Sequence, residues 1–332
     1  MINVAQIGVG YWGPNLLRTL VASKDCEIAL VIDASPERRA FVGSLYPAIS
    51  TGADPAEVFN NSSIDAVVIA TPANTHFRLA MAALRAGKHV LVEKPMATSV
   101  DEVDQIGALA REKSLVAMVG HTFLFNPAVR YLKKLIDEGE VGDVRYIYSQ
   151  RLNLGRIRSD VDALWNLAPH DISIIQYLLG NPEPLSITRT GMDFIQKGID
   201  DVVFLNIKYP GNILAHVHVS WLDPHKVRTV TVVGSRKMVI YDDVADNKIA
   251  IYDKGIDVEG PAQLGQNMHY DKGVPPSFVH RSGDLCMPAI SWKEPLQTEI
   301  AHFLSCVQSG ADCLTGPSHA REVVRILSAS NE

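Results

Sequence analysis

The first 120 residues alternate short, continuously apolar runs with longer amphipathic stretches. The apolar runs are rich in Val and Ile, and they predict strands at 4–7, 28–32, 66–70, 90–92 and 115–119. The stretches between them have helical spacing, and they predict helices at 14–22, 36–45, 75–86 and 100–112. Continuously apolar strands are typical of a parallel sheet covered by helices on both faces. The alternation therefore predicts a doubly wound α/β domain over residues 1–120.

The pattern changes after residue 120. Further helices are predicted at 127–138, 170–179, 296–308 and 319–328, and strands at 144–152, 202–208, 214–220, 228–233 and 238–241. The strands follow one another and are separated by turn signals such as Pro210-Gly211-Asn212. Residues 255–295 are rich in Gly and Pro and predict loops. The second part, residues 121–332, is therefore expected to be an α+β domain with a mostly antiparallel sheet.

Chain length and net charge limit the kinds of protein that this sequence can encode. A chain of 332 residues suggests two domains, and 31 basic against 37 acidic residues give a formal net charge of −6. This balance disfavours a nucleic-acid binder, because neutralising phosphates needs a basic surface. No apolar run approaches the roughly 18 residues of a membrane span, and the first residues do not resemble a signal peptide. We expect a soluble, cytoplasmic protein with no membrane association.

The four cysteines do not indicate a metal site. None of Cys26, Cys286, Cys306 and Cys313 forms a CxxC pair, and no Cys/His spacing typical of zinc proteins is evident. A reducing compartment agrees with this pattern, and we expect no bound metal.

A glycine-rich motif, Gly8-Val9-Gly10-Tyr11-Trp12-Gly13, stands between the first predicted strand and helix. In a dinucleotide-binding fingerprint the first glycine makes the tight turn and the second lets the backbone approach the pyrophosphate. The third allows close helix–strand packing. The start of the following helix offers free N–H groups to phosphate. The motif therefore predicts a dinucleotide site.

An acidic residue at the expected distance supports this prediction. Asp33 ends the second strand, 20 residues after Gly13, where a carboxylate can accept hydrogen bonds from ribose hydroxyls and so favours NAD over NADP. Arg38 keeps NADP open, since a nearby arginine can meet a 2′-phosphate.

Two later strand ends carry polar side chains. One is Thr71-Pro72-Ala73-Asn74-Thr75-His76 and the other is Glu93-Lys94-Pro95. Ligands of open α/β sheets bind outside the carboxyl ends of the strands, so Lys94 is expected to point its ammonium into the cleft. The competing interpretation is a solvated surface lysine. The expected cofactor-binding residues are Gly8, Gly10, Tyr11, Trp12, Gly13, Asp33, Arg38, Thr71, Pro72, Asn74, His76, Glu93 and Lys94.

Together with Pro169-His170-Asp171, these motifs resemble the Gfo/Idh/MocA family from residue 2 to about residue 325. The resemblance implies an N-terminal Rossmann domain and a C-terminal domain whose large, mostly antiparallel sheet mediates homodimers or homotetramers. It also implies that Lys94 hydrogen-bonds the reacting hydroxyl or carbonyl and that His170 is the catalytic histidine. The chemistry agrees, because a histidine near neutrality can take the alcohol proton and a lysine can stabilise alkoxide charge.

One position departs from the family pattern. The family often has an aspartate four residues before the histidine, and here that residue is Asn166. The amide can still hydrogen-bond, but it brings no negative charge to raise the pKa of the histidine. Asp171 is no simple substitute, since neighbours on a helix point in different directions. This departure leaves the acid–base network in question.

Substrate class is suggested by resemblance alone. Two segments most resemble family members that act on nucleotide-linked sugars. They are 164–171 and 220–224, and Lys226 and Arg228 follow the second. The reactions of those members include oxidation at C3 of UDP-N-acetylglucosaminuronate. Arg151, Arg156 and Arg158 are candidate anion contacts, because an arginine fork suits carboxylate or phosphate; solvated surface charges are the alternative. The expected substrate-binding residues are Lys94, His121, Arg151, Asn153, Arg158, Asn166 and His170, with Phe123, Asn126 and Tyr148 as possible neighbours.

Three hypotheses follow. The first is an NAD-dependent dehydrogenase of a nucleotide-linked sugar or uronate. The second is a dehydrogenase of a free polyol or inositol. The third is a non-catalytic NAD-binding sensor, which Asn166 keeps open and which Lys94 and His170 oppose.

Overall fold

The structure is a computed structural model that describes residues 1–155, 157–259 and 277–329. Its contacts divide the chain into two compact units. The first unit comprises Met1–Val129, Leu164–Glu183 and Trp292–Glu332, and the second comprises Arg130–Ala163 and Pro184–Ser291. Each unit therefore draws on separate segments of the chain, whereas the sequence pattern suggests one boundary after residue 120.

The first unit contains a six-stranded parallel sheet. Its strands are β1 (Ile2–Ile7), β2 (Cys26–Ile32), β3 (Thr51–Gly52), β4 (Ala66–Ile69), β5 (His89–Glu93) and β6 (Ala117–Gly120), in the order β3-β2-β1-β4-β5-β6. This order reverses between β1 and β4, where such sheets bind ligands outside the carboxyl ends of the strands. The predicted doubly wound α/β domain is confirmed.

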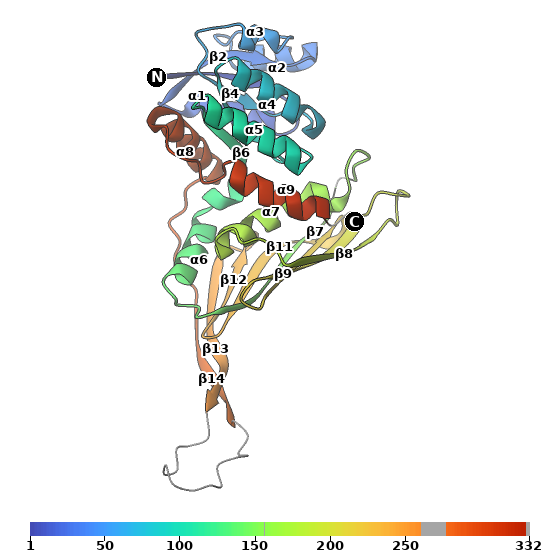
Figure 1. Ribbon diagram of the computed structural model, residues 1–332, viewed down its shortest axis with the longest axis vertical. Helices are drawn as coiled ribbons and strands as arrows, with labels where there is room; N and C mark the ends of the chain where they lie inside the picture. The colour runs from blue at the N-terminus through green and yellow to red at the C-terminus, as the bar shows by residue number, and fades with distance from the viewer. Residues whose placement is uncertain (156, 260–276, 330–332) are drawn as a thin grey trace. The chain divides into compact units, whose positions relative to one another are not determined.

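Helices flank this sheet (Figure 1). They are α1 (Gly13–Ala22), α2 (Pro36–Leu45), α3 (Ala56–Phe59), α4 (His76–Arg85) and α5 (Val100–Glu112), with the 3-10 turns η1 (Ala73–Thr75) and η2 (Thr122–Phe125). Two helices from the end of the chain join them: α8 (Pro295–Ser309) packs on α1 and η2, and α9 (Pro317–Ala329) packs on α5 and β6. The apolar faces of β4, β5, α4 and α5 meet in a fully buried core.

Helix α7 (Ala163–Leu179) begins seven residues before the predicted start at residue 170. The predicted start was wrong, and Pro169, which cannot donate a backbone hydrogen bond, lies inside the helix. Leu164, Ala168 and Ile172 recur at helical spacing and are fully buried, so their burial holds the first turns in place. His170 therefore lies within α7 and not at its start.

The second unit contains an eight-stranded, mostly antiparallel sheet, as predicted. Its strands are β7 (Val144–Leu154), β8 (Ser186–Met192), β9 (Val202–Tyr209), β10 (Ile213–Ser220), β11 (Leu222–Gly234), β12 (Met238–Asp242), β13 (Ile249–Glu259) and β14 (Ser277–Cys286), and the preceding helix is α6 (Pro127–Asp137). The order is β14-β13-β12-β11-β7-β10-β9-β8, and only the β10–β7 pair among these is parallel.

The loops predicted at 255–295 are in part a long antiparallel hairpin of β13 and β14 (Figure 1). Two glycines of this stretch, Gly255 and Gly283, lie inside the paired strands. A Cβ at Gly283 would come 2.4 Å from the carbonyl oxygen of Asp253, so glycine allows close approach of the two backbones there. Residues 260–276 of the predicted loop lie outside the described residues. Within the described part of the chain, no helix is both long and apolar enough to cross a membrane.

Candidate active site

The glycine-rich loop joins β1 to α1 and has the shape of a phosphate cradle. Gly8 has a φ of +97°, and a Cβ there would meet the carbonyl oxygen of Ala70 at 2.5 Å, while a Cβ at Gly13 would meet the Gly8 carbonyl oxygen at 2.5 Å. A Cβ at Gly10 would meet nothing within 4 Å. Gln6, fully buried, fixes the loop by donating to the carbonyls of Gly8 and Gly13, each at 2.9 Å. The loop is thus closed on its inner side and open at Gly10, which fits a dinucleotide pyrophosphate.

Asp33 lies beside this loop at the end of β2. Its Oδ2 accepts the Val9 amide at 2.7 Å, and its Oδ1 accepts the Ser35 amide at 2.9 Å. An ionised carboxylate has about four acceptor positions, so these two bonds orient the group and leave acceptor capacity for ribose hydroxyls.

The arginine engaged at this position is Arg39. Its guanidinium donates to the carbonyls of Asp33 and Ala34, at 2.7 and 3.0 Å. The Arg38 side chain, which the sequence analysis considered for a 2′-phosphate, is exposed, and its backbone amide donates to Ser35 Oγ at 3.2 Å. Arg39 thus packs on the backbone that carries Asp33.

His76 ties together the segments that follow β4 and β5. Its Nδ1 lies 2.7 Å from the Pro95 carbonyl oxygen, and its Nε2 lies 2.8 Å from the Thr71 carbonyl oxygen. The His76 side chain is buried. Burial lowers its pKa, and the two carbonyls oppose this effect. Thr71 also shares a 2.6 Å hydrogen bond with Thr75. His76 therefore holds both strand ends in position, while Pro72 and Asn74 are exposed at the rim with Tyr11 and Trp12.

Lys94 follows β5 and reaches helix α7. Its Nζ donates a 2.8 Å hydrogen bond to the backbone carbonyl of Asn166, and the side chain is half-buried. This bond is inconsistent with a freely solvated surface lysine. It directs the ammonium from the strand end toward the helix that carries His170.

His170 lies one helical turn beyond Asn166 and is half-buried. Its ring meets the ring of Phe123 edge to face, with centroids 5.0 Å apart. The His170 carbonyl accepts the Ser173 hydroxyl at 2.8 Å. The Phe123 contact orients the imidazole, while Asp171 next to it is buried.

His121, at the end of β6, is buried and pairs with another histidine. Its ring lies edge-on to His319 of α9, with centroids 5.3 Å apart. Burial lowers the pKa of His121 well below its ordinary value, and the positive charges of His319 and Lys94 lower it further. Burial also lowers the pKa of His319 to about 4. Both imidazoles are therefore neutral at neutral pH.

Two acidic side chains with raised pKa values influence each other: Glu93, next to Lys94, and Glu299 on α8. Burial raises the pKa of Glu93 to about 7, whereas Lys94 and Trp12 lower it in part. Burial raises the pKa of Glu299 on α8 well above its ordinary value, and the charge of Glu93 raises it further. Thr122 donates to Glu299 Oε2 at 2.8 Å and opposes the shift. Both carboxyl groups therefore hold their protons to higher pH than exposed carboxyl groups do, and Glu93 titrates near neutral pH.

The predicted substrate residues of the second unit have partners of their own. Arg151 is buried within β7, and Asn153, on the same strand, packs against Gly155. Arg158 is exposed and makes a two-pronged ion pair with Asp160, at 2.5 and 2.8 Å. Arg156 lies outside the described residues. A role of Arg151, Asn153 and Arg158 toward substrate stays a prediction.

Comparison with known proteins identifies the family. Residues 2–121 match the model described as "Oxidoreductase family, NAD-binding Rossmann fold", and residues 129–240 match the "GFO/IDH/MocA C-terminal domain". These are the N- and C-terminal models of one family, and together they span most of the chain.

The chain belongs to the Gfo/Idh/MocA family of oxidoreductases.

Several dehydrogenases are similar to this family member. A 4-carboxy-2-hydroxymuconate-6-semialdehyde dehydrogenase from Sphingobium sp. is 34% identical over 54% of this chain and 59% of its own length. UDP-N-acetylglucosamine 3-dehydrogenase from Acidithiobacillus ferrooxidans is 33% identical over 56% of each chain. Inositol 2-dehydrogenase 2 from Saccharopolyspora erythraea is 30% identical over 66% of each. The chain thus matches less than two thirds of the length of these relatives.

The fold likeness extends further than these alignments. The solved structure of the Acidithiobacillus ferrooxidans UDP-N-acetylglucosamine 3-dehydrogenase superposes with a TM-score of 0.79 over 98% of this chain and 95% of that one, at 24% identity. At this identity the likeness shows the fold and not the substrate. The resemblance predicted from the motifs is confirmed at the level of family and fold.

Three residues around the candidate site were not predicted from the sequence. Gln6 and Arg39 brace the loop and Asp33, while burial and the charge of Glu93 raise the pKa of Glu299. Glu299 had a detectable signal: it lies three residues after Leu296 and four before Phe303, on the apolar face of its helix. An acid on such a face is rarely a solvated charge.

Proposed function

We propose that this chain is an NAD-dependent dehydrogenase that transfers a hydride from a secondary alcohol of a sugar, with a nucleotide-linked sugar or uronate as substrate. The observation that carries the proposal is the 2.8 Å hydrogen bond between Lys94 Nζ and the Asn166 carbonyl. It joins the lysine at the carboxyl end of β5 to the helix that bears His170. A lysine and a histidine gathered at this edge of a dinucleotide-binding sheet suit alcohol oxidation.

Binding of the cofactor is assigned to the glycine-rich loop and Asp33. The open side of Gly10 and the start of α1 would hold the pyrophosphate, and Asp33 would accept the ribose hydroxyls. When bound, NAD supplies the hydride acceptor. The negative charge of Asp33 would repel a 2′-phosphate, which supports NAD over NADP.

Proton transfer is assigned to His170 and charge stabilisation to Lys94. Oxidation of a secondary alcohol breaks the C–H bond with loss of a hydride and the O–H bond with loss of a proton. Neutral His170 would take the proton, and the Lys94 ammonium would donate a hydrogen bond to the oxygen as negative charge develops on it. The ring of Phe123 keeps the imidazole oriented during this step.

The substrate class draws on similarity and on sequence. UDP-N-acetylglucosamine 3-dehydrogenase is among the similar proteins, and the segments 164–171 and 220–224 resemble members acting on nucleotide-linked sugars. A second candidate substrate is inositol or another free polyol, which the similarity to an inositol 2-dehydrogenase favours.

A substrate panel distinguishes these functions. The protein is mixed with NAD and, in turn, UDP-N-acetylglucosamine, its uronate, other UDP-sugars and free inositols, and absorbance of the reduced nicotinamide is followed. Turnover with a UDP-linked sugar supports the proposal, and turnover confined to free polyols favours the second candidate. Binding of NAD without turnover of any alcohol would favour a sensor and overturn the proposal.

Assembly through the sheet of the second unit is proposed as well. Phe204 on β9 and His218 on β10 stack with centroids 4.3 Å apart, and the paired positions of β10 and β7 place Leu214 and Tyr146 on the same face. Phe204, Leu214 and Tyr146 are each about 40% exposed. A face with this much exposed apolar area suits a homodimer or homotetramer interface.

A further inference from the structure

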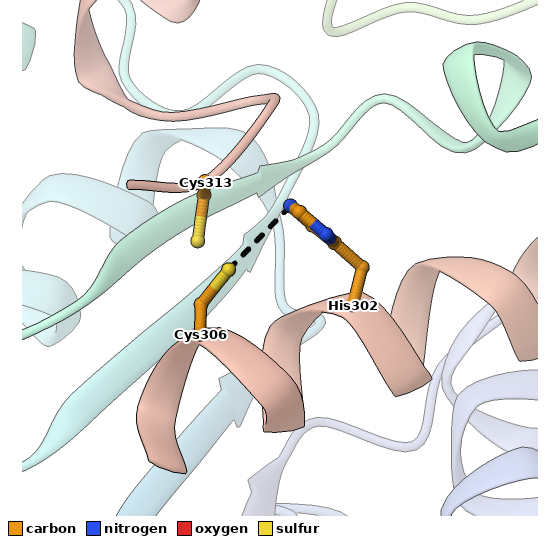
Figure 2. A group of neighbouring side chains, drawn as sticks. All are labelled: His302, Cys306 and Cys313. Atoms are coloured by element: carbon orange, nitrogen blue, oxygen red, sulfur yellow. Dashed lines mark hydrogen bonds between the residues drawn. The ribbon is translucent and has the colours of Figure 1, made fainter. Parts of the chain in front are cut away.

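A second group of reactive side chains lies in the first unit, outside the residues assigned above. His302 and Cys306 project from α8, and Cys313 belongs to the segment between α8 and α9. Figure 2 shows the three side chains pointing toward one another. One ligand atom from each, an imidazole nitrogen and two Sγ atoms, lies within 4.8 Å of the other two.

The local sequence explains this convergence. His302 and Cys306 are four residues apart, so they share one face of the helix. Helix α8 then ends at Gly310, whose φ of +71° makes a left-handed cap with its amide on the Cys306 carbonyl at 2.8 Å. The chain reverses direction at this cap, which brings Cys313 close to His302 and Cys306.

The hydrogen bonds define the state of each donor atom. The Leu314 amide donates to His302 Nε2 at 3.0 Å, so this nitrogen carries the lone pair. The Cys306 Sγ lies 3.5 Å from the same nitrogen (Figure 2) and 3.8 Å from the Asp312 carbonyl oxygen, so its S–H has two acceptors within reach. Nε2 of His302 and the Cys306 sulfur are therefore direct neighbours.

One of the three separations equals that of a tetrahedral zinc site. Zinc sites have Zn–S bonds of about 2.3 Å and Zn–N bonds of about 2.0 Å in a tetrahedron, which puts ligating sulfur and nitrogen about 3.5 Å apart. The observed Cys306–His302 separation has this value. Cys306 is buried, whereas His302 and Cys313 are half-buried, so a cation can enter from the surface.

We propose that His302, Cys306 and Cys313 bind a divalent cation of borderline softness, zinc, with water as the fourth ligand. Binding releases the two thiol protons to solvent, and the Leu314 amide gives up Nε2 to the cation. The ion would stabilise the segment beyond α8, whose Thr315 carbonyl accepts the Val119 amide of β6 at 2.9 Å. Binding at this site does not depend on the proposed dehydrogenase activity.

Metal binding is tested on the full chain. The protein is reduced, freed of metal with a chelator and titrated with Co²⁺. We expect one Co²⁺ per chain, a thiolate-to-cobalt charge-transfer band in the near ultraviolet and the intense visible bands of tetrahedral cobalt. Zinc should then protect two of the four thiols from a thiol reagent and raise the temperature of unfolding. The absence of these bands, or oxidation of Cys306 and Cys313 to a disulfide with no metal uptake after reduction, would overturn the proposal.

Variants locate the site. Cys306→Ser and Cys313→Ser should each lose the charge-transfer intensity and the zinc-dependent rise in unfolding temperature. The matched control is Cys286→Ser, which removes an exposed thiol on β14 and should keep both. Equal cobalt spectra in Cys306→Ser, Cys313→Ser and the wild type would contradict the assignment even if cobalt binds elsewhere.

Discussion

The Lys94 ammonium donates a hydrogen bond of 2.8 Å to the backbone carbonyl of Asn166, although the two residues are 72 positions apart in the chain. The bond joins a strand end of the parallel sheet to helix α7 within the first unit. Asn166 therefore contacts Lys94 through its main chain. This relationship makes the roles of Lys94, Asn166 and His170 separately testable.

Asp33→Ala should weaken NAD binding and reduce discrimination against NADP. Charge-assisted hydrogen bonds contribute about 1.5–3 kcal/mol, so we expect a loss of affinity of about 10- to 100-fold. Dissociation constants for both cofactors, measured by calorimetry, check this. Asp33→Ala also loses the hydrogen bond from the Val9 amide. Asp33→Asn keeps one acceptor oxygen for that amide, so comparing the two variants separates loss of this bond from loss of the negative charge. Unchanged cofactor preference in both variants would remove Asp33 from recognition.

Asn166→Asp should shift the pH dependence of turnover. A carboxylate one turn before His170 would favour the charged imidazolium and raise the pKa of the histidine. Because the base must be neutral, the acid limb of kcat/KM should move to higher pH. The rate measured across pH tests this, and the Lys94 bond to the main-chain carbonyl should persist. An unmoved acid limb would indicate that His170 is not the titrating base.

Glu299→Gln should make stability less dependent on pH. Folding raises the pKa of Glu299 above its ordinary value of 4.5, so the folded state holds its proton more tightly than the unfolded state does. The free energy of unfolding must then fall as pH rises from 4.5 toward the folded pKa. The neutral amide removes this contribution.

Thermal unfolding midpoints between about pH 5 and about pH 9 measure the effect of Glu299→Gln. The wild type should lose more stability over this range than the variant. Glu112→Gln, at the exposed end of α5, is the matched control and should behave as the wild type. Parallel curves for all three proteins would show that Glu299 titrates normally in the folded state.

Phe204→Lys should disrupt assembly. The substitution places a charge on the exposed face of the second sheet, next to His218, and desolvating that charge in an interface is unfavourable. Light scattering after size-exclusion chromatography should show a smaller particle than the wild type. Leu45→Lys, which also replaces an exposed apolar residue, should leave the mass unchanged. A wild-type monomer, or an intact oligomer in the Phe204 variant, would contradict the proposed interface.

Local patterns explain which parts of the structure could be predicted. The glycine-rich loop and Asp33 belong to one βαβ unit, so spacing alone indicated them. Strands β13 and β14 were missed because Gly255 and Gly283 look like turn residues, although they allow two strands to approach. The first turns of α7 were also missed, and burial of Leu164 and Ala168 stabilises them.

Contacts between residues far apart in the sequence could not be predicted from local sequence patterns. The hydrogen bond of Thr122 to Glu299 spans 177 positions, and the Lys94–Asn166 bond depends on a main-chain carbonyl that no residue type encodes. The cluster at His302, Cys306 and Cys313 was not predicted, because its spacing in the sequence is not one of the Cys/His spacings typical of zinc proteins, and the turn after α8 brings Cys313 to the other two residues. Side chains brought together by tertiary packing need the structure.

The measurement that tests the central claim most directly is the rate of NADH formation by Lys94→Ala with the alcohol that the wild type oxidises. Loss of the ammonium should reduce kcat by about 10²- to 10⁴-fold, because charge stabilisation at the reacting oxygen is lost. The NAD dissociation constant should stay within several-fold, and Lys113→Ala, an exposed lysine at the end of α5, should match the wild type. Wild-type turnover in Lys94→Ala would contradict the account.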